Sequence, residues 1–153
     1  MPQQKTLNIA IIEDEPNVRE PVTQFINQQQ DMTMVAAFRN VESFLTPESP
    51  FSPPDILLLD ISLPHGISGL EGIPKINKKY PELAIIMLTT ASNSETVFEA
   101  LQLGAVSYLN KKNDLKTITE TIRIVNQGGS YMSPAIARKI ANFFPQQTTP
   151  PKH

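Results

Sequence analysis

The sequence of 153 residues contains no cysteine, which excludes disulfide bonds, thiolate zinc sites and cysteine-based catalysis. No apolar run approaches the ~20 residues that a membrane-spanning helix needs. The start, Met1 to Thr6, is polar and the first apolar run is too short for a signal peptide, so we expect a cytoplasmic location. The net charge of -2 gives no electrostatic sign of nucleic-acid binding, so any contact with DNA would have to come from another domain.

An apolar run that ends abruptly in a carboxylate lies near the middle of the chain. Residues Ile56 to Leu59 are apolar without alternation, which is typical of a central parallel strand covered on both faces. Asp60 follows directly, at the expected carboxyl end of this strand. In open α/β sheets ligands bind outside the carboxyl ends of the strands, so Asp60 is better placed for chemistry than for packing.

A second apolar run, residues 7–12, ends in the acidic residues Glu13, Asp14 and Glu15. If the two strands share one sheet, these carboxylates and Asp60 form a cluster whose charges repel one another. A hard cation such as Mg²⁺ would relieve that repulsion, because it prefers oxygen ligands. One acidic residue after a strand is more simply a solvated turn, but two such strand ends in one chain, taken together with the motifs described below, favour a functional site.

Strand-like and helix-like segments alternate five times along the chain, which predicts a parallel sheet with helices on both faces. Pro16 can open the first helix, but Pro21 should kink that helix or delay its start, because proline lacks the N–H that a helix interior needs. We therefore expect an α/β fold with a five-stranded parallel, doubly wound sheet and a short C-terminal helix. The expected strands are 7–12, 32–38, 56–59, 83–88 and 105–109.

The strand ends, taken in order, carry the motifs of a known family. They are the acidic pair at Glu13, an Asp-x-x-Leu-Pro motif from Asp60, a Leu-Thr pair ending at Thr89, and Gly-Ala-x-x-Tyr-Leu from Gly104 followed by Lys111. In this order and spacing, over about residues 7–127, the sequence resembles the receiver domains of two-component response regulators. Within them it is most similar to the subgroup that precedes a LuxR-type helix-turn-helix domain.

The resemblance implies a flavodoxin-like receiver domain over residues 5–128 that undergoes phosphoryl transfer. Asp60 would be the phosphoacceptor, taking a phosphoryl group from a sensor histidine kinase in a Mg²⁺-dependent step. Asp14 would bind Mg²⁺ directly and Glu13 through water, and Asp60 and the backbone carbonyl of Ser62 would complete the protein ligands. The chain would be a signalling phosphoacceptor and not an enzyme acting on other substrates.

The same resemblance implies roles for three more residues. Lys111 and the Thr89 hydroxyl would contact oxygens of the phosphoryl group, and Thr89 would move together with Tyr108 as a switch. The switch would alter a surface made by the fourth helix, the fifth strand and the fifth helix. Taken singly, a surface lysine, a strand-end threonine and a half-buried tyrosine are the simpler interpretations.

Some positions depart from the family pattern. The glycine expected after Asp-x-x-Leu-Pro comes one residue later, at Gly69, so the preceding loop should hold an extra residue. Lys112 replaces a common proline, which leaves the conformation of that peptide bond open, and Thr90 replaces a common alanine and should crowd the entrance to the site. His65 lies close in sequence, but a lone histidine in a glycine-containing loop is more simply solvated.

Three other functions fit the sequence less well. A phosphatase of the haloacid dehalogenase kind needs a second aspartate two residues after the nucleophile, where Ser62 stands. A flavin or dinucleotide carrier would need a phosphate-binding loop after the first strand, where the acidic residues would repel phosphate. A receiver-like interaction module that no longer takes phosphate should have lost Asp60, Asp14 or Lys111, and all three are present.

The tail continues beyond the expected receiver. Ser133 and Pro134 predict the cap and first turn of a helix whose apolar face includes Ile136, Ile140 and Phe143 or Phe144. We expect a helical extension over 129–144 that packs on its own receiver or on a partner, then a linker over 145–153. The proline-rich linker favours a fragment of a longer transcription regulator that dimerises on phosphorylation. A stand-alone receiver acting by protein contact is the alternative.

Overall fold

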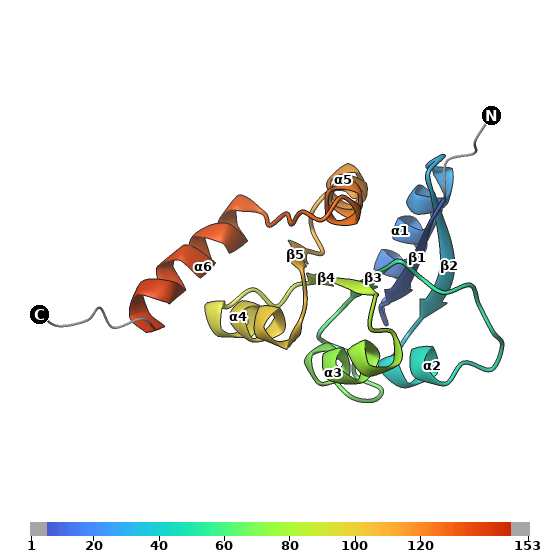
Figure 1. Ribbon diagram of the computed structural model, residues 1–153, viewed down its shortest axis with the longest axis horizontal. Helices are drawn as coiled ribbons and strands as arrows, with labels where there is room; N and C mark the ends of the chain where they lie inside the picture. Colours follow the sequence, from blue (N-terminus) through green and yellow to red (C-terminus); the bar gives the residue numbers. More distant parts are fainter. Residues whose placement is uncertain (1–5, 148–153) are drawn as a thin grey trace, which may run out of the picture.

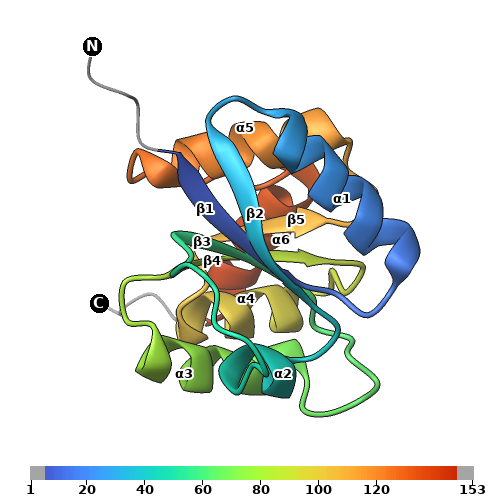
Figure 2. The same cartoon turned by 90° about the vertical axis from the view of Figure 1, so that its right-hand side faces the viewer.

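Five parallel strands form a sheet in the order β2-β1-β3-β4-β5, with helices packed on both faces (Figures 1 and 2). The computed structural model describes the backbone of residues 6–147 and the side chains of residues 6–142. This is the doubly wound α/β fold expected from the sequence. The strands are β1 (Leu7–Ile12), β2 (Met32–Phe38), β3 (Ile56–Leu59), β4 (Ala84–Thr89) and β5 (Ser107–Asn110). The helices are α1 (Pro16–Gln28), α2 (Val41–Leu45), α3 (Gly69–Lys79), α4 (Ser94–Leu103), α5 (Leu115–Asn126) and α6 (Pro134–Gln147).

Successive residues of each strand point to opposite faces of the sheet, so the strands contribute to two separate cores. Ile56 and Leu58 of β3 belong to the core under α1 and α5, whereas Leu57 and Leu59 belong to the core over α2, α3 and α4. All four are buried. Figure 2 shows the two helical layers, with α1 and α5 above the sheet and α2, α3 and α4 below it. The unbroken apolar run is therefore explained by a strand that is covered on both sides.

The first helix, α1, begins at Pro16 and includes Pro21. The delayed helix start that was one expected effect of Pro21 is therefore wrong. Proline at position 21 deprives the carbonyl of Asn17 of its helical partner. Both Pro21 and Asn17 are exposed, so water can reach the carbonyl that Pro21 leaves unpaired. Pro74 lies equally far into α3 and is also exposed. An early, solvated proline is thus tolerated twice in this fold.

The strand ends agree with the expected ones to within two residues. β4 and β5 begin one and two residues later than expected and each ends one residue later, which brings Thr89 and Asn110 into the ladder. Gly104 terminates α4 with a φ of 125°, a conformation that favours glycine. Asp114 caps α5 by accepting a hydrogen bond from the backbone N–H of Thr117 at 2.7 Å.

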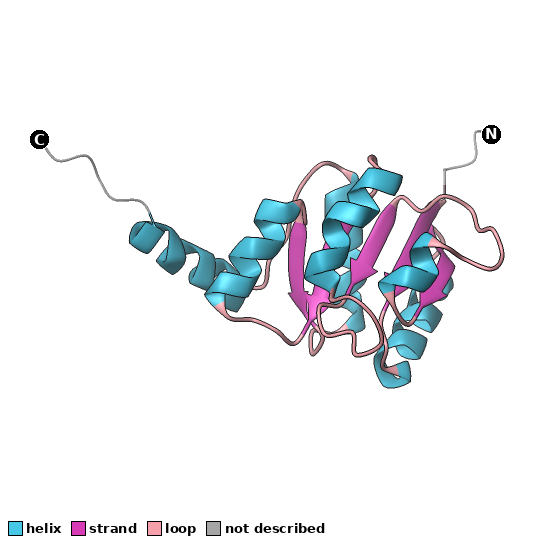
Figure 3. Ribbon diagram, turned by 90° about the horizontal axis from the view of Figure 1, so that it is seen from below, coloured by secondary structure: helices cyan, strands magenta, loops and turns pink. Residues whose placement is uncertain are grey.

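The tail packs on its own receiver. Met132 forms a parallel bridge with Tyr108 along the outer edge of β5, and α6 then lies beside α4 (Figures 1 and 3). Ile136 is buried, and Ile140 packs against the same core. α6 runs to Gln147, so it continues past the expected end at 144. The side chains of Phe143 and Phe144 lie outside the described residues. In residues 6–147, no helix has the length and apolarity needed to cross a membrane.

Candidate functional site

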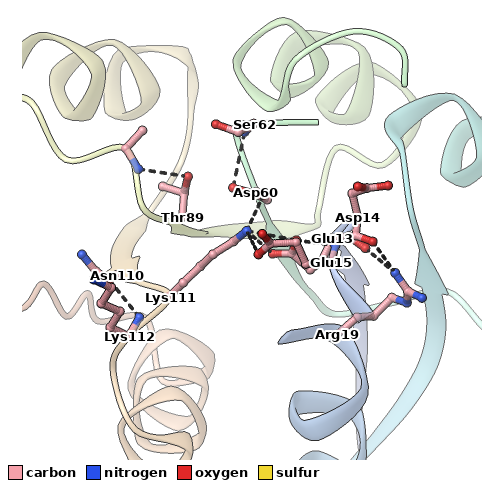
Figure 4. A network of polar contacts seen from close by, with 11 residues as sticks. Glu13, Asp14, Glu15, Arg19, Asp60, Ser62, Thr89, Asn110, Lys111 and Lys112 are labelled. Atoms are coloured by element: carbon pink, nitrogen blue, oxygen red, sulfur yellow. Dashed lines mark hydrogen bonds and ion pairs between the residues drawn. The ribbon is translucent and has the colours of Figure 1, made fainter. Parts of the chain in front are cut away.

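The strand order brings the predicted site residues to one edge of the sheet. β1 lies between β2 and β3, so the crossovers on its two sides run in opposite directions, and ligand sites of open α/β sheets form at such a switch point. The ends of β1 and β3 are paired in register, Ile12 with Leu59, which places Glu13 beside Asp60. Figure 4 shows Lys111 reaching from the end of β5 toward these acidic side chains.

Lys111 is the centre of the charge cluster. Its ammonium nitrogen lies 2.9 Å from an oxygen of Glu13, 2.9 Å from Asp60 Oδ2 and 3.1 Å from Glu15 Oε2. The side chains of Glu13 and Asp60 are each 1% exposed, and that of Lys111 is 9% exposed. Burial alone would lower the pKa of Lys111, but its bonds to Asp60, Glu13 and Glu15 outweigh burial and raise that pKa. The ammonium therefore stays charged and holds the buried carboxylates together.

One lysine does not satisfy both buried carboxylates. Glu13 Oε1 and Asp60 Oδ2 are buried and have no hydrogen-bond donor, although each lies close to the ammonium. Burial is also the main cause that raises the pKa of Glu13. Two neighbouring buried oxygens of this kind suit a hard cation, so the donor set fits Mg²⁺. Within residues 6–147 no group of three or more acidic or histidine side chains is arranged to hold a metal ion by itself.

Asp14 lies on the solvent side of the cluster. Its carboxylate is 22% exposed and is 3.5 Å from the guanidinium of Arg39, which lies in the loop after β2. Arg19 of α1 donates to the backbone carbonyls of Glu13 and Asp14, at 2.8 and 3.1 Å. Arg19 thereby fixes the turn after β1, and the carboxylate of Asp14 remains accessible to a metal ion.

The loop after β3 forms the other wall of the site. The backbone N–H of Ser62 lies 3.4 Å from Asp60 Oδ1, and Ser62 borders a cleft of about 660 Å³ together with Asp14, Thr90 and Lys111. Gly69 begins α3 against this loop, and a Cβ there would lie 2.0 Å from the carbonyl oxygen of Asp60. Only glycine allows so close an approach. The shifted glycine of the sequence thus still brings α3 against the backbone of Asp60.

The two residues of the expected switch are both buried. Thr89 is fully buried, and its hydroxyl oxygen accepts a hydrogen bond from the backbone N–H of Ala91 at 3.3 Å. Tyr108 is also fully buried, and its hydroxyl donates to the backbone carbonyl of Ala91. Burial, followed by the negative charge of Asp60, raises the pKa of Tyr108. The tyrosine is therefore a neutral donor to the β4–α4 loop, residues 90–93.

Some contacts of the site could not be read from the sequence. Glu15 received no role of its own, yet its carboxylate contacts Lys111, and Arg19 and Arg39 were not predicted at all. A third acid directly after the acidic pair is the one sequence signal that could have pointed to Glu15. His65 is exposed and does not line the cleft. The peptide bond before Lys112 is trans, like every peptide bond in the described part of the chain.

Fold and site together define a class of protein: a flavodoxin-like α/β domain with an acidic cluster and a lysine at the switch point. Residues 9–123 match the family of response regulator receiver domains. The chain belongs to this family. This confirms the resemblance on which the sequence analysis relied.

Relatives of known function are whole regulators that are longer than this chain. The oxygen regulatory protein NreC of Staphylococcus epidermidis is 33% identical over 143 residues, which cover 93% of this chain and 65% of NreC. The transcriptional regulatory protein LnrK of Bacillus subtilis is 30% identical over 136 residues, which cover 89% of this chain and 61% of LnrK. The chain thus spans less than two thirds of each of these relatives.

Solved structures of response regulators share the fold. A two-component response regulator of the LuxR family from Aurantimonas sp. SI85-9A1 has a TM-score of 0.81 and 27% identity, and the match covers 92% of this chain and 99% of that one. A structure of the RcsB response regulator from Salmonella typhimurium has a TM-score of 0.83 at 19% identity, covering 97% of this chain and 73% of that one. The second similarity concerns the fold alone.

Proposed function

We propose that this receiver domain accepts a phosphoryl group on Asp60 in a Mg²⁺-dependent step. The observation that carries the proposal is the buried carboxylate of Asp60 at the switch point, 2.9 Å from the ammonium of Lys111 and beside a second buried acid. Asp60 Oδ2 is ion-paired with Lys111 but accepts no hydrogen bond, so it can act as a nucleophile or bind a cation once the ammonium moves. Phosphoryl transfer depends mainly on positioning and charge neutralisation, and this site offers both.

Each residue near Asp60 has a separate task in this proposal. Asp14, Asp60 and the carbonyl of Ser62 would hold Mg²⁺, with Glu13 acting through water, and the ion would supply positive charge for the phosphoryl oxygens. Lys111 exchanges its bonds to the carboxylates for a bond to a phosphoryl oxygen, which places a buried cation where negative charge accumulates. Thr89 donates its hydroxyl proton to another phosphoryl oxygen, and Tyr108 responds to that movement.

The partners follow from the chemistry and from the relatives. The donor is a sensor histidine kinase in the cytoplasm, and the domain is a signalling switch whose only reactions are its own phosphorylation and dephosphorylation. Two relatives are named as regulatory proteins, one of them transcriptional, so we propose that a DNA-binding output domain belongs to the same regulator. Phosphorylation then favours a homodimer, because such regulators bind two half-sites.

The test of the phosphoacceptor is direct. The chain is incubated with Mg²⁺ and acetyl phosphate, and intact-mass analysis is expected to show one added phosphate on the native chain and none on Asp60→Asn. Asp114→Asn is the matched control, because Asp114 is a helix cap in which asparagine can replace aspartate, and it should be modified like the native chain. Equal modification of Asp60→Asn would show that the site is assigned wrongly.

Dimerisation needs its own measurement. Sedimentation velocity with and without beryllofluoride, a mimic of the phosphoryl group, is expected to show a shift from monomer toward dimer. A domain that binds beryllofluoride and remains monomeric would favour the alternative, a receiver that acts through contact with a different protein.

A further inference from the structure

The α6 helix covers the side of the receiver where the switch residues lie. Ile136 of α6 is 2% exposed and belongs to the same apolar core as Tyr108 of β5 and Val97 and Ala100 of α4. Figure 1 shows α6 next to α4 and clear of α1 and α2. The surface expected to change on phosphorylation is therefore partly occupied by the chain's own tail.

A polar contact fixes α6 to the β4–α4 loop. The ammonium of Lys139 donates to the backbone carbonyl of Ser92 at 2.6 Å, and it lies 3.2 Å from the hydroxyl of the same residue. A hydrogen bond from a charged donor is stronger than one between neutral groups, and this one joins residues 47 positions apart. The position of Ser92 therefore contributes directly to the docking of α6.

The same loop is also bonded to the phosphoacceptor site. Ala91 precedes Ser92, and its backbone N–H donates to Thr89 while its carbonyl accepts from Tyr108. Two adjacent residues thus have different partners: Ala91 is held by the two switch residues, and Ser92 is held by α6. A movement of Thr89 that shifts Ala91 is passed on to Ser92, because the Ala91 carbonyl and the Ser92 N–H and Cα belong to one planar peptide unit.

We propose that α6 is an internal ligand of the β4–α4 loop and that phosphorylation of Asp60 releases it. This inference rests on the proposed function. When the Thr89 hydroxyl turns toward a phosphoryl oxygen, the bond from Ala91 is lost and the loop shifts toward the site. The carbonyl of Ser92 then moves away from Lys139, and α6 undocks together with Ile136. By thermodynamic reciprocity, a docked α6 disfavours the phosphorylated arrangement, so loosening α6 makes the site easier to load.

The absence of cysteine makes the release measurable. Ile136→Cys places a single thiol under α6, and its rate of alkylation under native conditions reports how often the helix opens. Adding Mg²⁺ and beryllofluoride is expected to raise this rate at least about tenfold, because coupling between two sites typically changes an equilibrium by about 5- to 150-fold. Ile73→Cys, a thiol at a fully buried position of α3, is the control and should remain equally protected with and without beryllofluoride.

A second pair of variants tests the polar contact. In the Ile136→Cys background, Lys139→Gln is expected to raise alkylation about tenfold before any beryllofluoride is added, because a bond from a charged donor is lost. Arg138→Gln removes a charge from the neighbouring exposed position and should leave the rate unchanged. Lys139→Gln should also lower the concentration of beryllofluoride needed for half loading.

Two readouts separate the inference from the function on which it rests. Fluorine NMR detects bound beryllofluoride, so an absent signal would overturn the proposed phosphoacceptor role itself. A clear signal with unchanged alkylation of the Ile136→Cys thiol would overturn the release of α6 and leave the phosphoacceptor role intact. If Ile136→Cys fails to fold, hydrogen exchange of the α6 amides in the native chain replaces it, and protection that persists in the loaded state would contradict the proposal.

Discussion

Two charge clusters at opposite ends of the sheet are built on different principles. At the amino end of β2, Arg123 of α5 forms two bonds with Asp31, at 2.8 and 3.0 Å, and a third with Gln29 at 2.9 Å. The Arg123 and Asp31 side chains are 37% and 36% exposed. At the carboxyl ends of the strands, Lys111 faces three carboxylates, and two of the buried oxygens have no hydrogen-bond donor.

The difference separates an ion pair that is complete by itself from one that fits the proposed phosphoacceptor site. The Arg123 cluster is geometrically complete and joins α5 to the start of β2, so it needs no further ligand. The Lys111 cluster has more negative than positive charge in a buried place, which is costly unless another cation or a chemical change relieves it. A protein retains such an imbalance where it binds or reacts, and that is where the proposed Mg²⁺ and phosphoryl group belong.

The largest effect should come from Asp14→Ala, which removes the accessible carboxylate of the proposed metal site. Mg²⁺ binding, followed by the amide shifts of Ser62 and Gly69 in NMR titrations, is expected to be lost throughout the millimolar range. Asp31→Ala removes a carboxylate from the other cluster and should leave the titration as in the native chain. An unchanged affinity in Asp14→Ala would rule out the proposed ligands.

The next largest effect compares the two cations. Lys111→Met should lower the free energy of unfolding by about 3 kcal/mol, because two buried carboxylates lose the ammonium that contacts both of them. Added Mg²⁺ should restore a large part of this loss. Arg123→Met should cost about 1 kcal/mol or less, and Mg²⁺ should restore none of it, because its partner is exposed to water. Urea unfolding measures the loss of stability of each variant with and without Mg²⁺. If Mg²⁺ restores the stability of both variants equally, the distinction between the two clusters is wrong.

The smallest effect concerns pH. The hydrogen bond from Arg123 lowers the pKa of Asp31 below its ordinary value of 3.8. A depressed carboxyl pKa gives stability that is present above the ordinary value and is lost as the pH falls through the folded one. Asp31→Asn should therefore cost about 0.5 kcal/mol at neutral pH, after allowance for screening by solvent. The difference from the native chain should close progressively as the pH falls below 3.8, and a difference that stays constant as the pH falls would contradict the assignment.

The parts of the molecule that follow from local pattern were predictable. The apolar run at 56–59 indicated a central strand, and strand ends that share one edge brought Asp60, Thr89 and Lys111 together. Helix caps at Gly104 and Asp114 followed from their own side chains and backbone preferences. These features depend on periodicity and on the chemistry of single residues, which the sequence displays directly.

Contacts between distant segments were not predictable in this way. Glu15 has the sequence signature of any exposed acid after a strand, and only the fold brings it within 3.1 Å of Lys111. Lys139 could be assigned to the polar face of α6, but its partner Ser92 depends on how that helix docks. The delayed start of the first helix, expected from Pro21, is wrong. Propensity rules take no account of whether water reaches the carbonyl that a proline leaves unpaired.

The stretch between α5 and α6 has a consequence for how the domain behaves when it is cut. Ser130 donates to the carbonyl of Val106 at 2.6 Å, Tyr131 is bonded to Ser107, and Met132 bridges to Tyr108, so residues 130–132 shield the outer edge of β5. A chain that ends at Gly128 would leave that edge open, and open strand edges pair readily with other chains. Self-association of such a shortened receiver would then be an artefact of its boundary, and a receiver extended through α6 is the form in which signal-dependent assembly can be measured.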